Sequence, residues 1–466
     1  MLKITKIKLS LLTDIDMTMF IESGIRGRIS QCSNRYSKAN NKYMTHFNPN
    51  ECSKFIMYLD ANNLYGWAME QYLPTGGFNW LTIDDFNQFN VTDISDESEK
   101  GYILEVDLEY PEYLHDDHND LPFCPIHEAP SGAKEKKLLT TLTNKEKYVV
   151  HYRYLKHAIK NGLKITKIHR ILEFDQSNWL QIYIRKNTNL RALAKNEFEK
   201  NFYKLMNNSV YGKTMEKVRK RVNVKLKTQW EGAHGVESLI SKPTFKTCTI
   251  FNDNLVAIES RLTDITINKP IYIGLCVLDI SKILLYDFHY QYMKKKFAKN
   301  CKLLYTDTDS LIYEIICDDV YEVMKQDIHL FDTSDYPVDN IYQMPRVNKK
   351  VVGLMKDECN GKIVTEFVGL RSKMYSMRVF GKDFIKKIRG VKASVVKNTI
   401  TFEHYKNCLF NETIEIREQR SIRSQFHKIY TEKQSKLALS PFDNKRYLFK
   451  NDTDTLAWGH KNIIVY

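Results

Sequence analysis

Two aspartates interrupt an apolar stretch that otherwise predicts a buried β-hairpin. The stretch KLLYTDTDSLIYEI runs from Lys302 to Ile315, with Asp307 and Asp309 at its centre. Two carboxylates about 4 Å apart repel by about 4 kcal/mol at an effective dielectric constant near 20, so both stay ionised only if a cation lies between them. Oxygen ligands favour Mg²⁺ or Mn²⁺ over zinc. The pair therefore predicts a divalent-metal site, with ordinary turn chemistry as the plainer alternative.

A third aspartate favours the metal site. Asp60 ends the apolar strand KFIMYLD (54–60) and precedes ANNLYGWAM, which predicts the start of a helix. An acid at a strand end that faces acids in a turn can bind two metal ions about 3.5 to 4 Å apart. Such a site transfers a phosphoryl or nucleotidyl group without a protein nucleophile.

A cationic stripe is predicted on a helix further along the chain. Its members are spaced by four, four and three residues and share one helix face: Lys200, Lys204, Asn208 and Tyr211. The opposite face, which we expect to pack, carries Phe198, Phe202, Leu205 and Ser209. The stripe predicts a grip for phosphates, with a solvated lysine pair as the alternative. Gly212 follows it and permits close approach of a nucleic acid strand.

Charge and cysteine usage narrow the range of partners and compartments. The chain has 70 Lys and Arg against 56 Asp and Glu, a formal charge of +14, which favours polyanions. Its nine scattered cysteines suit a reducing compartment. The sequence shows no signal peptide and no stretch of roughly 20 apolar residues. We therefore expect an intracellular protein, in the nucleus, with no membrane partner.

Strand and helix patterns alternate irregularly, which favours an α+β fold over a doubly wound sheet. The patterns predict two strands and then two long helices at 54–60, 102–110, 178–211 and 278–295. An acidic, polar surface excursion is expected at Thr82–Gly101. The basic stretch Tyr211–Gln229 changes from helical spacing to strand alternation, and it is either a solvated hairpin or a DNA-contacting ribbon.

Four of these motifs together resemble those of family B DNA polymerases. YTDTDS (305–310) resembles the third palm motif and DANNLY (60–65) the first. KLMNNSVYG (204–212) resembles the fingers motif, and SKMY (372–375) the motif that holds the primer end. The four stand in the family's order, which is far more specific than any one alone. The longer sequences around these motifs are most similar to those of the protein-primed branch, which includes the polymerases of Polinton or Maverick transposons, viruses and linear plasmids.

The resemblance implies a right-hand polymerase with an antiparallel palm sheet and helical fingers and thumb. An N-terminal segment, a first palm part with an insertion, fingers, a second palm part and a thumb are expected at 1–50, 51–177, 178–212, 213–375 and 376–466. A basic insertion at about 213–268 is expected to support strand displacement and processivity. Only 59 residues precede Asp60, so we expect no proofreading exonuclease domain in this chain.

The resemblance also implies roles for individual residues. The catalytic acids would be Asp60, Asp307 and Asp309, of which Asp307 supports the other two. Two Mg²⁺ ions, or Mn²⁺ in their place, would bind Asp60, Asp309 and the carbonyl of Ala61. Nucleotide contacts would come from Tyr65, Lys200, Lys204, Asn208 and Tyr211, with Tyr65 excluding a 2′-hydroxyl. Contacts to DNA would come from Gly212, Lys282, Lys373 and Tyr375.

The implied function is template-directed DNA synthesis, in which dNTPs are joined to a DNA 3′-hydroxyl during protein-primed replication of a mobile element or virus-like genome. Primer-template DNA and dNTPs are the expected partners, with a terminal protein added if priming uses one. A catalytically inert remnant that only binds nucleic acid is the alternative, and the three intact acids argue against it. A reverse transcriptase would show Tyr-x-Asp-Asp and lack the cationic stripe.

The sequence departs from the family pattern at two places. GIRGRIS (24–30) lies where protein-primed enzymes have a Tyr-x-Gly-Gly loop; Ile25 replaces the tyrosine and Arg28 the second glycine, so template handling at this loop is expected to differ. Asn63 and Gly66 stand where many relatives have serine and proline. Neither supplies a metal ligand, so the chemistry is expected to survive.

Two further groups of residues are expected to have ordinary structural roles. Asp107 and Glu109 form an Asp-x-Glu pair of the exonuclease type, but they follow the first palm motif and lie on an expected exposed strand face. The other group has zinc-like spacing within a loop crowded by prolines and acids, which favours a polar loop over zinc: His115, His118, Cys124 and His127.

Overall fold

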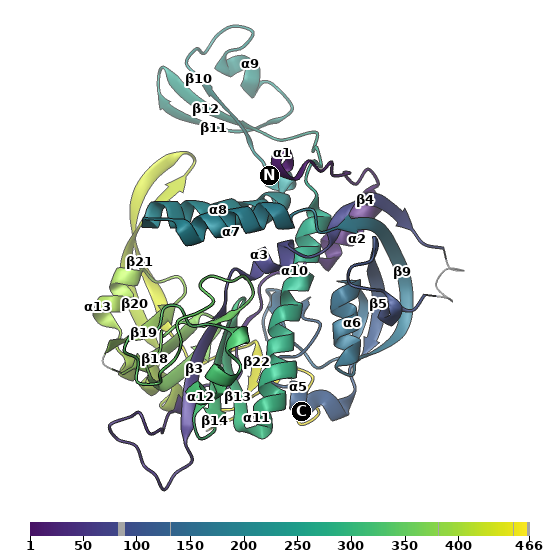
Figure 1. Ribbon diagram of the computed structural model, residues 1–466. Coiled ribbons are helices and arrows are strands. Elements are labelled where there is room, and N and C mark those ends of the chain that lie inside the picture. The colour runs from purple at the N-terminus through teal and green to yellow at the C-terminus, as the bar shows by residue number, and fades with distance from the viewer. Residues whose placement is uncertain (83–88, 131, 381, 451, 464–466) are drawn as a thin grey trace.

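A ten-stranded sheet assembled from distant parts of the chain forms the centre of the structure (Figure 1). The computed structural model describes residues 1–82, 89–130, 132–380, 382–450 and 452–463. The main path of this central sheet runs through β1 (Ser30–Cys32), β13 (Cys301–Asp307), β14 (Ser310–Ile316), β3 (Lys54–Ala61), β17 (Val364–Arg371), β18 (Met374–Val379) and β19 (Lys382–Ile388). Three short strands are attached to it: β2 (Tyr36–Lys38), β15 (Phe331–Asp332) and β16 (Met355–Asp357). Apart from the parallel pair of β15 and β16, its pairs are antiparallel.

Strand β3 occupies the middle of the central sheet, which confirms the strand expected at 54–60. It pairs with β14 along one edge and with β16 and β17 along the other. Because side chains alternate along a strand, Phe55 and Met57 enter the main apolar core while Ile56 enters a second cluster. Asp60, the penultimate residue of β3, lies on the same face as Ile56.

A second antiparallel sheet, of four strands, lies beside the central one. Its spatial order is β4 (Leu73–Trp80), β9 (Lys164–Ser177), β5 (Lys100–Glu109) and β8 (Lys145–His151). Helix α6 (Tyr152–Lys160) follows β8 directly and packs against this sheet. The strand expected at 102–110 is confirmed as the greater part of β5.

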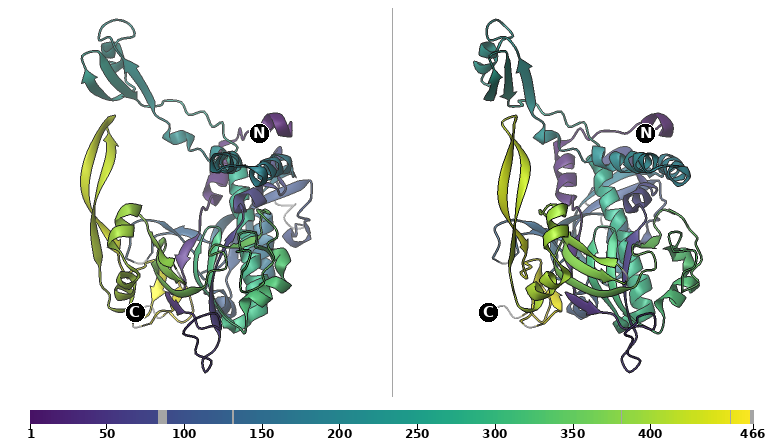
Figure 2. Two further views of the ribbon diagram at one scale, coloured as in Figure 1. Left: turned by 60° about the vertical axis from the view of Figure 1, so that its left-hand side comes forward. Right: turned by 90° about the vertical axis from the view of Figure 1, so that its left-hand side faces the viewer.

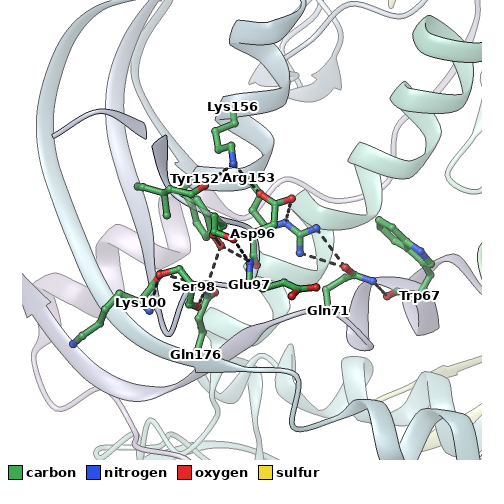
Figure 3. A network of polar contacts seen from close by, with 12 residues as sticks. Trp67, Gln71, Asp96, Glu97, Ser98, Lys100, Tyr152, Arg153, Lys156 and Gln176 are labelled. Atoms are coloured by element: carbon green, nitrogen blue, oxygen red, sulfur yellow. Dashed lines mark hydrogen bonds and ion pairs between the residues drawn. The ribbon is translucent and has the colours of Figure 1, made fainter. Parts of the chain in front are cut away.

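An acidic segment at residues 94–98 is held against α6, and α6 in turn contacts the chain just after α3 (Leu64–Met69), the helix that follows Asp60 (Figure 3). The Asp96 carboxylate lies 3.0 Å from Arg153 Nε and 2.9 Å from Lys156 Nζ, both on α6. Arg153 Nη2 also donates to Gln71 Oε1 at 3.3 Å, just after α3. The described part of the expected polar excursion is therefore held by ion pairs; residues 83–88 of it lie outside the described residues.

Two helices form the segment expected to be the fingers: α7 (Gln181–Leu193) and α8 (Glu197–Thr214). The single helix expected at 178–211 was therefore wrong. The chain leaves helical conformation at Ala194, with φ −60° and ψ 133°, and α8 begins where the Asn196 side chain accepts from Glu199 N at 2.8 Å.

The packing face of α8 also differs from the prediction. The side expected to pack is exposed: Phe198, Phe202, Leu205 and Ser209. The buried side carries Asn207, Val210 and Thr214, and Asn207 Nδ2 donates to Thr188 Oγ1 of α7 at 3.3 Å. Helical periodicity locates the faces of a helix, but the neighbouring helix decides which face becomes buried.

A small separate unit lies within the segment expected to be the basic insertion. Its antiparallel sheet has the order β10 (Asn223–Lys227), β12 (Leu255–Ser260) and β11 (Phe245–Asn252). Helix α9 (Val236–Ile240) covers it through an apolar cluster that includes Val236 and Ile258. The unit stands apart from the rest of the molecule in Figures 1 and 2.

The C-terminal region, 376–466, differs from the helical thumb that we expected. Its helices are short, α13 (Ala393–Thr399) and α14 (Phe402–Phe410), and its longest elements are the paired strands β20 (Glu415–Gln425) and β21 (Lys428–Leu439). This hairpin rises toward the insertion in Figure 2. The rings of Phe251, at the end of β11, and His427, in the turn between β20 and β21, have centroids 6.5 Å apart.

Helix α10 (Ile271–Tyr286) crosses the structure and is almost fully buried. It continues through a π-helical segment (Asp287–Met293) into α11 (Lys294–Phe297), so the helix expected at 278–295 begins at Ile271. The other short elements are α1 (Leu2–Thr5), α2 (Ile15–Gly24), α5 (His115–His118), α12 (Val320–Gln326), β6 (Ile126–Glu128), β7 (Lys137–Leu139), β22 (Arg446–Leu448) and β23 (Thr455–Ala457). Within the described residues, helices lack the combination of length and apolar character that crossing a bilayer requires.

Candidate active site

The two aspartates expected in a hairpin lie at the turn between β13 and β14. Asp309 N donates to Asp307 O at 2.8 Å, and Thr308 between them has φ 68°. This is the hydrogen bond of a γ-turn, a strained conformation for a β-branched residue. Thr308 N donates in turn to Ile29 O at 2.8 Å, just before β1. A strained turn held by its surroundings is typical of functional sites.

Asp60 meets the same turn through the register of β3 and β14. Ser310 pairs with Asp60, and Ala61 N donates to Asp309 O at 2.7 Å. The end of β3 therefore lies beside the turn. All three predicted acids line one cavity of about 620 Å³, together with Ala61.

Burial is the main cause of a raised pKa at Asp60 and also at Asp309. Repulsion from Asp309 and Glu358 raises the pKa of Asp60 further, whereas Lys204 and Lys356 lower it. Within the described residues neither Asp60 nor Asp309 has an ion-pair partner within 4.0 Å. The two carboxylates therefore share a cavity in which added positive charge would favour their ionised forms.

Asp307 differs because it is already paired with a lysine. Lys373 Nζ lies 2.8 Å from Asp307 Oδ1 and 2.7 Å from Oδ2, and Lys373 N donates to the Tyr305 hydroxyl at 2.8 Å. Of the three predicted acids, Asp60 and Asp309 are therefore left as carboxylate donors for an added cation. This all-oxygen donor set fits a hard divalent ion such as Mg²⁺ or Mn²⁺.

Helix α8 contributes to the cavity wall, but less than the predicted stripe implied. Lys204 and Asn208 line the cavity, and Tyr211 stacks on Tyr65 with ring centroids 4.7 Å apart and planes 24° apart. Lys200 does not line it: its ammonium lies 2.7 Å from Glu197 Oε1. Of the four stripe residues, two therefore line the cavity and a third stacks on Tyr65, which also lines it.

The predicted glycine of the stripe, Gly212, lies at an exposed position near the end of α8. A Cβ added there would meet no described atom within 4 Å. The described chain therefore leaves open space at this glycine, and its packing alone does not require one.

Of the other three predicted DNA contacts, Lys373 and Tyr375 line the cavity, and the Tyr375 hydroxyl donates to that of Tyr58 at 3.4 Å. The DNA contact predicted at Lys282 is not supported by the structure. Its side chain is 7% exposed, and its ammonium lies 2.8 Å from Asp279 Oδ1, also on α10. An ammonium that is buried and paired in this way is not presented to a DNA strand.

Several charged residues that line the cavity escaped prediction. They come from loops, strands and helix α7, far apart in the sequence: Arg28, Arg191, Lys350, Lys356, Glu358, Lys387 and Arg389. The only local signal concerned Lys356 and Glu358, because alternation along β16 buries Met355 and Asp357 and leaves the intervening positions for the other face. The rest are gathered by tertiary structure.

The remaining candidates have structural partners. Asp107 accepts from Lys147 N at 2.7 Å and pairs with His169 at 2.8 Å, and Glu109 pairs with Lys164 at 3.7 Å. In the expected polar loop, His115 Nδ1 accepts from Lys461 N and His118 Nδ1 hydrogen-bonds the Tyr110 hydroxyl. Among the described residues, no group of three or more His, Cys, Asp or Glu side chains is placed to hold a metal ion.

The two departures in the first palm motif are coupled. Asn63 caps α3 with φ 48°, and asparagine tolerates this left-handed conformation better than most residues. A Cβ added at Gly66 would lie 2.0 Å from Asn63 Nδ2. The Asn63 side chain thus occupies the space that a larger residue at position 66 would need.

Comparisons with known proteins show the family and the fold of this chain. A family model described as DNA polymerase type B, organellar and viral, matches residues 43–295, more than half of the chain. No curated protein matches this chain. Three solved structures of phi29 DNA polymerase match it. They are the complex with primer-template DNA and incoming nucleotides (TM-score 0.57, 14% identity), the orthorhombic crystal form (0.54, 15%) and the primer-template complex (0.52, 15%).

These alignments cover 93–94% of this chain and 64–65% of the phi29 chain, so the chain spans just under two thirds of that polymerase. The likeness confirms the expected right-hand fold, built here from antiparallel sheets with the helices α7 and α8 beside them. The sequence match shows that the chain belongs to the organellar and viral type B DNA polymerases.

Proposed function

We propose that the chain synthesises DNA on a template by adding dNTPs to a DNA 3′-hydroxyl. One observation supports the proposal above all others. Asp60 and Asp309, without ion-pair partners in the described chain, share a cavity with Lys204 and Asn208 from α8. Paired carboxylates opposite a cationic helix can serve transfer to or from a triphosphate, because the acids hold cations while the helix binds phosphate oxygens.

Asp60, Asp309 and the Ala61 carbonyl would hold Mg²⁺ or Mn²⁺, which would supply activation of the 3′-hydroxyl and neutralisation of the triphosphate charge. Lys204 binds triphosphate oxygens through its ammonium. Tyr65 lies under the sugar, where its ring leaves no room for a 2′-hydroxyl. Asn208 and Tyr211 border the nascent base pair.

The primer end is held on the other side of the cavity by Lys373 and Tyr375. Lys373 also neutralises Asp307, which therefore supports the turn and its electrostatic field while Asp60 and Asp309 hold the ions. This division follows from charge. A carboxylate that already binds an ammonium through both oxygens has less to offer a second cation than one without a partner.

The insertion and the C-terminal hairpin are proposed to enclose the DNA that leaves the site. The contact between Phe251 and His427 supports this role, since it joins the ends of two units that rise from opposite parts of the chain (Figure 2). Enclosure would favour processive synthesis and strand displacement. The basic ribbon of β10, with Lys225 and Lys227, adds charge for phosphate contacts.

We further infer protein-primed replication of a mobile element or virus-like genome, with a terminal protein as partner. Family membership and the phi29-like fold support this inference. All nine cysteines are described, and all are free thiols, which supports an intracellular, reducing compartment, for which we propose the nucleus.

A primer-extension assay tests the proposed function. The purified chain is given Mg²⁺ and either dNTPs or rNTPs on primed DNA and primed RNA templates. We expect extension with dNTPs on DNA, loss of extension in Asp60→Asn and Asp309→Asn, and retained DNA binding in both. Asp117→Asn, an exposed acid on α5, is the matched control and should keep full activity. Binding without extension by the wild type would indicate the inert remnant, and extension on RNA a reverse transcriptase.

A further inference from the structure

The loop between α2 and β1 carries an arginine, Arg28, at the edge of the active-site cavity. The loop backbone on its N-terminal side is fixed by Arg26. Arg26 Nη1 donates to Val149 O of β8 at 2.7 Å, and its guanidinium lies 3.8 Å from the ring centroid of Tyr148. Lys282 of α10 donates to Arg26 O at 3.3 Å. The residue mistaken for a DNA contact therefore anchors this loop.

The C-terminal side of the loop is fixed to the catalytic turn itself. Ile29 O accepts from Thr308 N at 2.8 Å, and Ser30 pairs with Asp307 at the start of β1. Arg28 thus follows directly from a backbone held on both sides, and its position relative to Asp307 and Asp309 is set by sheet pairing. A loop built in this way delivers one side chain to a defined place.

Arg28 lies beside the tyrosine that is proposed to lie under the sugar, since both residues line the active-site cavity and also a small second cavity next to it. Burial raises the pKa of the Tyr65 phenol, whereas the charge of Arg28 lowers it. The same guanidinium lowers the pKa of Asp309. Within the described residues Arg28 has no ion-pair partner within 4.0 Å.

Stacking and hydrogen bonding constrain Tyr65 in different directions. The ring of Tyr211, 4.7 Å away, limits tilt of the Tyr65 ring but leaves it free to slide within its own plane. A hydrogen bond at the hydroxyl removes that freedom. A guanidinium only donates, and the phenol oxygen can accept, so Arg28 suits this position in a way that a carboxylate or a glycine does not.

We propose that Arg28 is a positioning residue that holds the hydroxyl of Tyr65 and thereby sharpens discrimination between deoxyribose and ribose. The inference rests on the proposed function, in which Tyr65 faces the sugar. Arg28 stands at a position where the sequence pattern of related enzymes has glycine, so the chain gains a contact that this pattern does not supply.

A double-mutant cycle tests the inference. The ratio of kcat/KM for dNTP to that for rNTP is measured in the wild type, Arg28→Gly, Tyr65→Phe and the double variant, with Arg28→Lys as the conservative replacement. We expect Arg28→Gly to lower the ratio about 10-fold, the value of one charged hydrogen bond. Tyr65→Phe should do the same, and the double variant should be no worse than either single one. Arg28→Lys should recover part of the ratio.

An unchanged ratio in Arg28→Gly, or additive losses in the double variant, would overturn the inference while leaving DNA synthesis intact. If the wild type does not extend a primer, the proposed function fails, and a second measurement still decides the contact. In protein labelled with ¹³C at tyrosine Cζ, the resonance absent from Tyr65→Phe identifies Tyr65. It should shift in Arg28→Gly, and no shift would also overturn the inference.

Discussion

Lys373 Nζ lies 2.8 Å from Oδ1 and 2.7 Å from Oδ2 of Asp307, which stands in the same turn as Asp309. The two residues lie 66 positions apart (373 − 307) and both side chains are only partly exposed, at 35% and 24%. The pair separates the two aspartates of the turn by role. Asp307 has a cationic partner within the chain, whereas Asp309 has no ion-pair partner within 4.0 Å among the described residues.

Breaking this pair should have a coupled effect. Lys373→Ala and Asp307→Asn should each lower kcat/KM for primer extension and the free energy of unfolding. The unfolding energies should couple by about 1 kcal/mol, the upper end for partly exposed pairs. Thermal melting and primer extension across the four proteins measure this. Lys387, an exposed cation that also lines the cavity, provides the control. The unfolding free-energy changes of Lys387→Ala and Asp307→Asn should be additive. Coupling as large as that between Lys373 and Asp307 would contradict a specific pair.

Lys204 and Lys200 provide a matched comparison on one helix. Lys204 lines the cavity, whereas Lys200 pairs with Glu197. Lys204→Ala should lower kcat/KM for dNTP by about 10- to 100-fold, because it removes a charge-assisted contact to phosphate. Lys200→Ala should change it less than about 3-fold. Steady-state single-nucleotide incorporation gives both values, and similar losses in the two variants would show that the stripe acts as a whole.

Substitutions at Asn63 and Gly66 should have coupled effects on the stability of the protein. Gly66→Ala places a Cβ at 2.0 Å from Asn63 Nδ2, the end of a side chain that can turn aside, so we expect it to destabilise the protein by at most about 1 kcal/mol. The double variant Asn63→Gly/Gly66→Ala should recover most of this, because the obstructing side chain is gone and glycine accepts φ 48°. Thermal melting of the four proteins is the measurement. A double variant less stable than Gly66→Ala would show that the clash is not the cause.

Stability should depend on pH through Asp60. The folded protein holds the pKa of Asp60 above its ordinary value of 3.8, mainly by burial, so the unfolded chain loses this proton first. Without divalent ions, the contribution of Asp60 to the free energy of unfolding should therefore fall as the pH rises from about 4 toward the raised pKa. Asp60→Asn should match the wild type near pH 4 and exceed its stability by at least about 1 kcal/mol at pH 8.

Addition of Mg²⁺ completes the pH experiment. At pH 8 it should stabilise the wild type more than Asp60→Asn, because an ion that binds the folded site shifts the unfolding equilibrium by mass action. Melting curves in chelator and in Mg²⁺, at both pH values, give the four differences. A wild type that is more stable than the variant at pH 8 in chelator would contradict the raised pKa.

Local sequence was enough to predict the acids and the strands that carry them. Asp60, Asp307 and Asp309 each follow or interrupt a short apolar strand, and such strands are recognisable without knowledge of their partners. The helices α7 and α8 were also recognisable as helical, although their boundary was not. A run of helix-favouring residues conceals the break at Ala194, whose extended conformation places α8 alongside α7.

The sequence was insufficient wherever the burial or the contacts of a side chain depend on an element that packs against it. Phe198 and Phe202 have the spacing of a packed face but remain exposed, since α7 lies on the other side of α8. Lys282 has the position of a DNA contact, yet Asp279 and the Arg26 carbonyl hold it inside. Arg28 belongs to the site only because β1 pairs with β13, and this pairing spans more than 270 residues.

The central position of β3 also sets an order of events during synthesis of the protein. Strand β14, its partner on one edge, begins at Ser310, 249 positions after Ala61 (310 − 61). At about 5 to 20 residues per second, a ribosome takes roughly 12 to 50 s to reach it. For that time the nascent chain displays an apolar strand with both edges open, which is the form of chain that chaperones bind and that aggregates when they do not. The cavity lined by Asp60 and Asp309 is therefore among the last parts of this protein to form.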